Sequence, residues 1–213
     1  MFDLSQTIAQ ELFLESNYPW EVLTKIKDFV LKTGPKLDKN EYKEIKDNIW
    51  VSKYSEISST ACIESPAIIQ KNVQIRHNAY IRGSVIVGEN CVVGNSTELK
   101  NCILLNNSQV PHFNYVGDSI LGYKSHMGAG SIISNLKSDK SKIIIKYNNS
   151  KIETNLRKFG ALVGDNVEIG CNSVLNPGTI IGKNSTIYPV TMVRGVINSN
   201  MIVKKDDLIV QKI

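Results

Sequence analysis

The stretch AIIQKNVQIRHNAYIRGSVIVGENCVVG, residues 67–94, places an aliphatic residue at every sixth position. The spacing continues in both directions, with one-residue slips before Leu104 and Leu121. An amphipathic helix would show spacings of three and four instead. A six-residue period sustained this long predicts a β-solenoid, in which each side of a coil is one short strand and its turn. The repeat positions are Ile57, Ile63, Ile69, Ile75, Ile81, Val87, Val93, Leu99, Leu104, Val110, Val116, Leu121, Met127, Ile133, Val163, Ile169, Leu175, Ile181, Ile187 and Val193.

Glycine follows the repeat position at Gly88, Gly94, Gly117, Gly122, Gly128, Gly164, Gly170 and Gly182. We expect these glycines to form tight turns by adopting positive φ, which costs glycine little. Three six-residue sides make a coil of about 18 residues. Residues one coil apart should therefore stack about 5 Å from each other.

The repeat divides the chain into a mainly β domain with additions. Residues 1–48 are expected to form an N-terminal helical segment, with two short helices within residues 4–33. The β-helix domain is predicted at residues 49–203. Residues 134–162 interrupt it, and IIIKY followed by NNS and KIET predicts a hairpin that protrudes from the solenoid. Residues 204–213 form a tail that is expected to cover the open end. One face of the second helix should be buried through Trp20, Leu23, Ile26 and Val30.

Composition limits the partners of the chain. The 213 residues are 42% hydrophobic and 21% charged, with a net charge of +5, and Lys and Arg are scattered. This pattern favours small anionic ligands over nucleic acid. The four cysteines lack paired spacing, and no basic, apolar leader precedes the first helix, so we expect a cytoplasmic protein with reduced thiols. No apolar run approaches the roughly 20 residues that span a bilayer.

Two cations should stack on the outer surface. Arg82 and Lys100 each follow a repeat position and are one coil apart, so both point outward. Stacked cations repel each other unless an anion lies between them, although like charges are often tolerated in solvent. The pair is thus either solvated or a clamp for a phosphate or carboxylate. Glu98 and Tyr115 fall in the adjoining outward column.

His112 is predicted at a corner of the solenoid. The coil above brings Ala129 over it, between Gly128 and Gly130, and the coil below brings Asn95. Histidine is the side chain whose unperturbed pKa lies near neutrality, so it can carry a proton between a substrate and solvent. It can equally be a hydrogen-bonded surface residue. The small residues around it leave room for a ligand along the backbone.

Two stretches resemble a known family. ELKNCILLNNSQVPHFNYVGDSILGYKSHMGAGSIISN, residues 98–135, resembles the acetyltransferase domain of bifunctional glucosamine-1-phosphate acetyltransferase / N-acetylglucosamine-1-phosphate uridylyltransferase. NLRKFGALVGDNVEIGCNSVLNPGTIIGKNSTIYP, residues 155–189, is similar to the archaeal sugar-1-phosphate nucleotidylyltransferase with a C-terminal acetyltransferase. The H-x-x-Y-x-G-D and G-A-G elements are the most specific. The resemblance covers about residues 50–200 and implies a left-handed parallel β-helix of hexapeptide repeats.

The resemblance implies transfer of acetyl from acetyl-CoA to the amine of an amino-sugar-1-phosphate, supporting nucleotide-sugar synthesis, by a homotrimer with sites between subunits. Its residue roles are His112 as general base, Arg82, Lys100, Tyr115, His126 and Asn135 as substrate ligands, and Ala129 and Cys171 as coenzyme A contacts. His126 stands where the uridylyltransferase-linked enzymes carry Asn, which leaves the sugar open. A further lysine of the family aligns with Lys137, Lys140 or Lys142.

Amide formation requires a base, because a sugar amine is largely protonated near neutrality. His112 suits this role, and Glu98 is expected to orient its imidazole. Backbone N–H groups at residues 128–130 are candidate donors to the tetrahedral oxyanion. No enzyme nucleophile or metal is needed.

Two other functions remain open. A three-histidine zinc site, as in β-helix carbonic anhydrases, would need closer ligands than His77, His112 and His126. A non-catalytic trimer that binds a sugar nucleotide or regulates a separate nucleotidylyltransferase would use the same binding residues. The chain is not expected to transfer nucleotides itself, since residues 1–50 contain one glycine, Gly34, and no glycine-rich phosphate loop.

Overall fold

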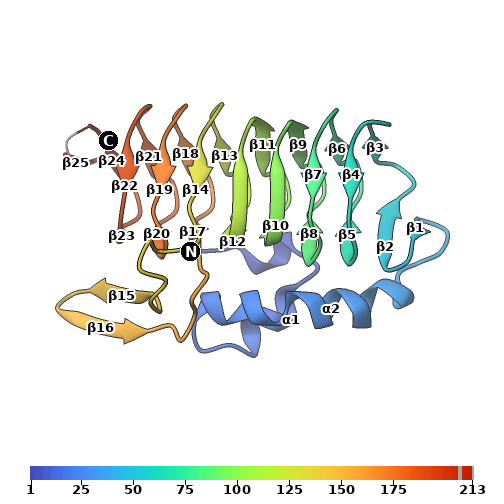
Figure 1. Cartoon of the computed structure of the whole chain (residues 1–213), viewed down its shortest axis with the longest axis horizontal. Coiled ribbons are helices and arrows are strands. Elements are labelled where there is room, and N and C mark those ends of the chain that lie inside the picture. The colour runs from blue at the N-terminus through green and yellow to red at the C-terminus, as the bar shows by residue number, and fades with distance from the viewer. Residues whose placement is uncertain (206–207, 213) are drawn as a thin grey trace.

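The repeats form a parallel β-solenoid of about nine turns (Figure 1). The computed structural model describes residues 1–205 and 208–212. Each coil contributes one strand to each of three faces, which confirms the hexapeptide β-helix that the six-residue period predicts. We name these the histidine face, the open face and the covered face.

The strands of the three faces are as follows. The histidine face contains β3 (Glu56–Ile57), β6 (Gln74–Ile75), β9 (Val92–Asn95), β11 (Gln109–His112), β13 (His126–Met127), β18 (Glu168–Ile169), β21 (Thr186–Ile187) and β24 (Met201–Val203). The open face contains β4 (Cys62–Ile63), β7 (Tyr80–Ile81), the first halves of β10 (Glu98–Leu104) and β12 (Tyr115–Leu121), β14 (Ile132–Ile133), β19 (Val174–Leu175) and β22 (Met192–Val193). The covered face contains β2 (Ile49–Ser52), β5 (Ala67–Ile69), β8 (Val85–Val87), the second halves of β10 and β12, β17 (Ala161–Val163), β20 (Thr179–Ile181) and β23 (Val196–Ile197).

The repeat positions point inward and form one continuous core along the solenoid axis. Almost all of them are buried, whereas Ile57 and Ile63 in the first coil are partly buried because no complete coil lies beneath them. Burial of stacked aliphatic side chains, each contributing about 1.5–3 kcal/mol relative to exposure, is what holds consecutive coils together.

The corner glycines serve a different purpose from the one predicted. None of the eight glycines that follow a repeat position has positive φ. Positive φ occurs mainly at asparagines such as Asn72 and Asn90, whose short polar side chains tolerate the left-handed region. The glycines provide space instead. A Cβ on Gly94, for example, would overlap the carbonyl oxygen of Pro111 in the next coil.

The one-residue slips in the repeat shorten one corner in two successive coils. Between the open and covered faces, β10 and β12 each run through the corner as one long strand. Each makes the bend with a single residue at positive φ, Asn101 and Asp118. These two side chains therefore meet at a tight polar corner.

Short helices cover one face of the solenoid. They are η1 (Leu4–Gln6), α1 (Gln10–Leu14), η2 (Pro19–Thr24), α2 (Ile26–Thr33) and η3 (Gly34–Lys36). The predicted second helix is divided at Lys25 into a 3₁₀ part and an α part, and its predicted apolar face is buried. It packs against an outward aliphatic row on the covered face: Ile68, Ile86, Ile103, Ile120 and Leu162. Residues 1–48 thus share a core with the solenoid.

The insertion in the repeat forms the predicted hairpin. Strands β15 (Ile144–Tyr147) and β16 (Ser150–Glu153) pair antiparallel and extend from the solenoid (Figure 1). At the base of the insertion, Leu136 pairs with Lys158, which closes the loop. Ile143 and Ile145 are buried with the helices and the covered face, so the hairpin base is anchored.

Hairpins lie at both ends of the solenoid. Strand β1 (Tyr42–Lys46) pairs antiparallel with β2, so this hairpin crosses the boundary predicted after residue 48. At the other end, β25 (Ile209–Gln211) pairs antiparallel with β24. Residues 206, 207 and 213 of the predicted tail lie outside the described residues. Both hairpins occupy strand edges that would otherwise offer unpaired backbone groups.

Candidate active site

The two stacked cations each have a carboxylate partner in the chain itself. Ile81 pairs with Leu99, so Arg82 and Lys100 stack as the repeat predicts. Arg82 Nη1 lies 2.8 Å from Glu98 Oε1, and Lys100 Nζ lies 3.3 Å from Asp118 Oδ2. An external anion is therefore not required to relieve their repulsion. A phosphate here would join or replace these carboxylates.

Glu98 contacts a different partner from the one predicted. Its carboxylate accepts from Arg82, and among the described residues no hydrogen bond joins it to His112. Its pairing with Tyr115 on β12 keeps it in the predicted outward column of the open face. The structure therefore makes Glu98 a residue that positions Arg82.

Asp118, the acid of the H-x-x-Y-x-G-D element, is the centre of a polar network, although the sequence analysis assigned it no role. The residue is 5% exposed. It accepts hydrogen bonds from Lys100 Nζ, from Asn101 Nδ2 at 2.9 Å, and from Asn135 Nδ2. The shortened repeats before Leu104 and Leu121 were the signal that could have identified this corner. A buried carboxylate held by three donors fixes the cation and the amide around it.

Tyr115 and Asn135 join this network. Asn135 Nδ2 also lies 3.2 Å from Tyr115 Oη, which accepts from it. Burial, with smaller contributions from Glu98 and Asp118, raises the pKa of the Tyr115 phenol, so the hydroxyl stays protonated near neutral pH. Gly117 makes this arrangement possible, because a Cβ there would collide with Tyr115 Oη. The phenol can accept from Asn135 and still donate to a substrate.

His112 ends β11 at the corner between the histidine face and the open face. Its N–H donates to Asn114 Oδ1 at 3.1 Å, and its carbonyl accepts from the Gly130 N–H at 3.0 Å. The side chain is exposed. The backbone is thus fixed by two coils while the ring remains accessible to a ligand at the corner.

Asn114 secures this corner and was also missed by the sequence reasoning. It is 2% exposed. Its Nδ2 donates to the Gly128 carbonyl at 2.9 Å and to Ser131 O and Oγ at 3.2 and 3.1 Å. These bonds tie the turn that carries His112 to the next coil. A buried hydrogen-bond network of this kind restricts the backbone geometry of His112.

Ala129 and Cys171 continue the His112 corner upward. The pairing of Met127 with Ile169 places Ala129 beside Cys171, and the Asn172 N–H donates to the Ala129 carbonyl at 2.9 Å. The Cys171 thiol is exposed and free. The N–H groups of Gly128 and Gly130 are occupied by bonds to neighbouring coils. Of the three predicted oxyanion donors, only the Ala129 N–H has no hydrogen-bond partner among the described residues.

His126 lies apart from the network of the open face. It begins β13 on the histidine face, and its Nδ1 lies 2.9 Å from Glu168 Oε2 in the next coil. The structure therefore brings together Arg82, Glu98, Lys100, Tyr115, Asp118 and Asn135, with His112 at the adjoining corner, and leaves His126 on a different face.

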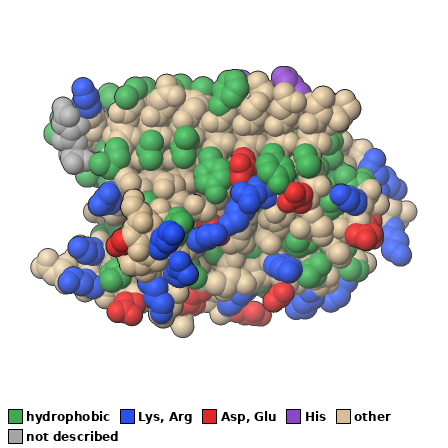
Figure 2. All heavy atoms as spheres, in the orientation of Figure 1, with side chains coloured by type: hydrophobic (Ala, Val, Ile, Leu, Met, Phe, Trp, Pro, Cys, Tyr) green, Lys and Arg blue, Asp and Glu red, His purple; other side chains and the backbone are tan. Residues whose placement is uncertain are grey.

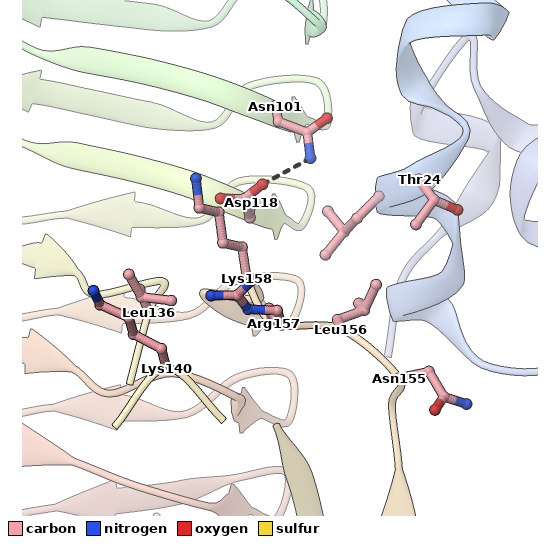
Figure 3. Close-up of a pocket in the computed structure, with 10 residues that line it drawn as sticks. Thr24, Asn101, Asp118, Leu136, Lys140, Asn155, Leu156, Arg157 and Lys158 are labelled. Carbon is pink, nitrogen blue, oxygen red and sulfur yellow. Dashed lines mark hydrogen bonds between the residues drawn. The ribbon is translucent and has the colours of Figure 1, made fainter. Parts of the chain in front are cut away.

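A cavity of about 690 Å³ adjoins the Asp118 corner (Figure 3). It lies between η2, the insertion and the solenoid. Of the three lysines that the sequence left ambiguous, Lys140 lines it, whereas Lys137 pairs with Asp139 and Lys142 with Asn155. Lys158, which sequence reasoning missed, extends toward Asp118 from the closing pair with Leu136 (Figure 3). The insertion thus adds cations beside the site.

Across residues 1–205 and 208–212, no three His, Cys, Asp or Glu side chains are arranged to hold a metal ion. His77 and His112 lie two coils apart in one corner column, with Asn95 between them. Within the described ranges, no helix is long and apolar enough to span a bilayer.

Two protein families match consecutive parts of the chain. Residues 63–155 match the GMPPB C-terminal domain, and residues 160–195 match the bacterial transferase hexapeptide, six repeats. The observed coils form a hexapeptide-repeat β-helix, and these two matches cover residues 63–155 and 160–195 of it.

Among curated proteins, the chain is 38% identical over 119 residues to the bifunctional protein GlmU of Methanococcus vannielii. It is 36% identical over 98 residues to the bifunctional sugar-1-phosphate nucleotidylyltransferase/acetyltransferase of Sulfurisphaera tokodaii. The first alignment covers 55% of this chain and 28% of the relative, and the second covers 46% and 24%. The resemblance predicted from the motifs is confirmed, and the chain spans less than a third of these relatives.

Two solved structures align with much of the chain at low sequence identity. One is a variant of perosamine N-acetyltransferase from Caulobacter crescentus in complex with CoA and GDP-perosamine, with a TM-score of 0.38, 12% identity, and coverage of 75% of this chain and 55% of that one. The other is a variant of the N-acyltransferase AntD from Bacillus cereus with dTDP and coenzyme A, with a TM-score of 0.44, 13% identity, and coverage of 82% and 91%.

Proposed function

We propose that the chain transfers the acetyl group of acetyl-CoA to the amine of an amino-sugar-1-phosphate, in support of nucleotide-sugar synthesis. The observation that carries this proposal is the arrangement across the open face. An accessible histidine, His112, lies at one corner, and the stacked cations Arg82 and Lys100 lie toward the other. One small sugar would place its amine at His112 and its phosphate at Arg82 and Lys100. The similarity to archaeal proteins named as acetyltransferases supports it.

The binding step uses the polar network around Asp118. The phosphate takes hydrogen bonds from Arg82 and Lys100, which Glu98 and Asp118 already hold in place. Charge-assisted bonds of this kind fix the position of the anion, and through it the position of the amine. Tyr115 donates to the sugar from the centre of the open face. The acids thus orient the cations before the substrate arrives.

The chemical step is proton removal followed by acyl transfer. His112 accepts a proton from the amine as its nitrogen attacks the thioester carbonyl, forming a C–N bond. The Ala129 N–H stabilises the oxyanion of the tetrahedral intermediate. When the C–S bond breaks, protonated His112 returns the proton to the departing thiolate. The products are the amide and free coenzyme A, with no change in the charge of the enzyme.

Acetyl-CoA is assigned to the corner above His112. The turns that contain Ala129 and Cys171 stack there, and their small side chains let a slender chain lie along the backbone. The thioester of a coenzyme lying there would reach His112 from the coil above. His126, on the adjacent strand of the histidine face, contributes to substrate selection only if a neighbouring subunit's open face meets it.

A homotrimer would provide such a neighbour. The outward column of the open face changes from polar to apolar as it rises, through Ile132, Val174 and Met192, which are 42%, 37% and 53% exposed. A column of exposed aliphatic side chains favours association with another subunit. Static light scattering should give about three times the chain mass of 23.7 kDa. A monomer at micromolar concentration would argue against sites shared between subunits.

The proposal is tested by thiol release from acetyl-CoA over a panel of amino-sugar-1-phosphates, including glucosamine-1-phosphate and galactosamine-1-phosphate. The same sugars without phosphate serve as controls. We expect turnover that requires both the amine and the phosphate. Absence of turnover with every amino sugar would contradict the proposal and favour a non-catalytic protein that binds a sugar nucleotide.

A further inference from the structure

The cavity beside Asp118 is larger than a sugar-phosphate site requires. Its volume of about 690 Å³ falls within the range of about 300–1,000 Å³ that is usual for sites of small organic ligands. It is continuous with the phosphate clamp, because Asp118 belongs to both. Its lining residues are Leu23, Thr24, Asn101, Asp118, Leu136, Lys140, Asn155, Leu156, Arg157 and Lys158. A substrate held at the clamp can therefore extend into it.

The cavity carries an excess of positive charge. Lys140, Arg157 and Lys158 line it, against a single carboxylate, Asp118, which Lys100 already pairs. No acid within residues 1–205 and 208–212 forms an ion pair with any of these three cations. Figure 2 shows Lys and Arg side chains gathered between the hairpin and the solenoid. This charge exceeds what one sugar phosphate at Arg82 and Lys100 needs.

The remaining walls are suited to an organic group. Leu23 from η2 and Leu136 and Leu156 from the insertion supply apolar surface. Asn101, Asn155 and Thr24 add polar groups, each of which already makes one hydrogen bond within the chain. An apolar wall with a few polar groups and adjacent cations matches a nucleoside that carries phosphate, whereas inorganic phosphate alone would leave the leucines without a partner.

We propose that this cavity binds the nucleotide part of a nucleoside-diphosphate-linked amino sugar, so that the preferred acceptor is longer than an amino-sugar-1-phosphate. This inference rests on the proposed function. The phosphate nearest the sugar lies at Arg82 and Lys100. The second phosphate lies against Arg157 and Lys158, and the nucleoside enters between the leucines of η2 and the insertion. The N-terminal helices therefore contribute one wall of the acceptor site.

The binding test uses the full chain and isothermal titration with UDP, GDP, ADP and inorganic pyrophosphate. We expect at least one nucleoside diphosphate to bind at least tenfold more tightly than pyrophosphate. Replacing Arg157 by Gln should weaken that binding about tenfold, the effect of losing one charge-assisted contact. Lys146→Gln, on the exposed hairpin strand β15, is the matched control and should leave binding unchanged. Binding no tighter than pyrophosphate, or equal effects of the two variants, would overturn the inference.

The turnover test separates this inference from the proposed function. We expect kcat/KM for a nucleoside-diphosphate glucosamine to exceed that for glucosamine-1-phosphate at least tenfold, and Thr24→Trp, which fills the cavity, to remove this advantage. If glucosamine-1-phosphate is acetylated equally well, the cavity inference fails and the proposed function stands. If no acceptor is acetylated while Arg157-dependent nucleotide binding is found, the proposed function fails, the acceptor part of the inference fails with it, and only the nucleotide site in the cavity stands.

Discussion

The covered face and the open face are built from the same coils but carry opposite outward side chains. On the covered face, the outward row from Ile68 to Leu162 is aliphatic and buried under the helices. On the open face, the corresponding positions hold Tyr80, Glu98 and Tyr115 in the lower coils. The inward repeat builds both faces alike. The outward residue at each position determines whether a face recruits a covering element or remains available to a ligand.

The corner between these faces shows how the two roles meet. The shortened corners of β10 and β12 bring Asn101 and Asp118 to the boundary. The insertion, anchored on the covered face, brings Lys158 to the same place. Elements that stabilise the covered face therefore also complete the site of the open face.

The largest expected effect lies at the far corner of the open face. His112→Ala should lower kcat for acetyl transfer by about 10²–10⁴, the usual contribution of a positioned base. Acceptor KM should change little, because Arg82 and Lys100 hold the phosphate. Raising the pH should partly restore the rate as more of the amine becomes deprotonated. Thiol release measured from pH 6 to 9 checks both points, and a variant as fast as the parent at pH 7 would show that His112 only forms the corner.

A substitution on the covered face should lower the free energy of unfolding and should not affect the chemical step. Ile103 is fully buried between β10 and the helices. Ile103→Ala should cost about 2–5 kcal/mol of unfolding free energy, the range for truncating a buried aliphatic side chain. Ile132→Ala on the open face, where the side chain is 42% exposed, is the matched comparison and should cost less than about 1 kcal/mol in the isolated chain.

Denaturant unfolding at two protein concentrations distinguishes the two faces. The effect of Ile103→Ala should not depend on protein concentration, because the helices that cover it belong to the same chain. A concentration-dependent effect of Ile132→Ala would indicate that another subunit covers the open face. Equal losses from both variants at low concentration would mean that the faces do not differ in the way described.

Much of the fold was predictable because it depends on local repetition. The period of six fixed which residues point inward, and it also gave the stacking of Arg82 under Lys100. The corner residues were predicted less well. The sequence predicts that glycines adopt positive φ at the turns. In the structure asparagines adopt positive φ, and the glycines allow the backbones of neighbouring coils to approach each other closely.

The parts of the site that escaped prediction depend on long-range contacts. Glu98 is predicted to orient His112, but its carboxylate pairs with the Arg82 guanidinium in the coil below. Lys158 extends toward Asp118 from an insertion about 40 residues later, and although the shortened repeats mark the Asp118 corner, nothing periodic in the sequence indicates that the insertion returns to it. The roles assigned to His112, Ala129 and Cys171 came from family resemblance, and they stay predictions.

The smallest expected effect concerns the boundary between the faces. Asp118→Asn keeps the shape of the side chain but replaces a carboxylate that accepts from Lys100, Asn101 and Asn135. An amide cannot accept from all three donors, so Asn135 and Lys100 lose their fixed positions. We expect kcat/KM for the acceptor to fall about tenfold. A hydrogen bond to a charged group contributes about 1.5–3 kcal/mol, and the greater net positive charge of the clamp offsets part of its loss. KM for acetyl-CoA should not change, because the proposed coenzyme site is at the other corner. Glu153→Gln, which removes an exposed carboxylate on the hairpin, is the control and should alter neither constant. If Asp118→Asn raised both KM values equally, its effect would be a general loosening of the solenoid, and the open face would lose its separation into an acceptor corner and a coenzyme corner.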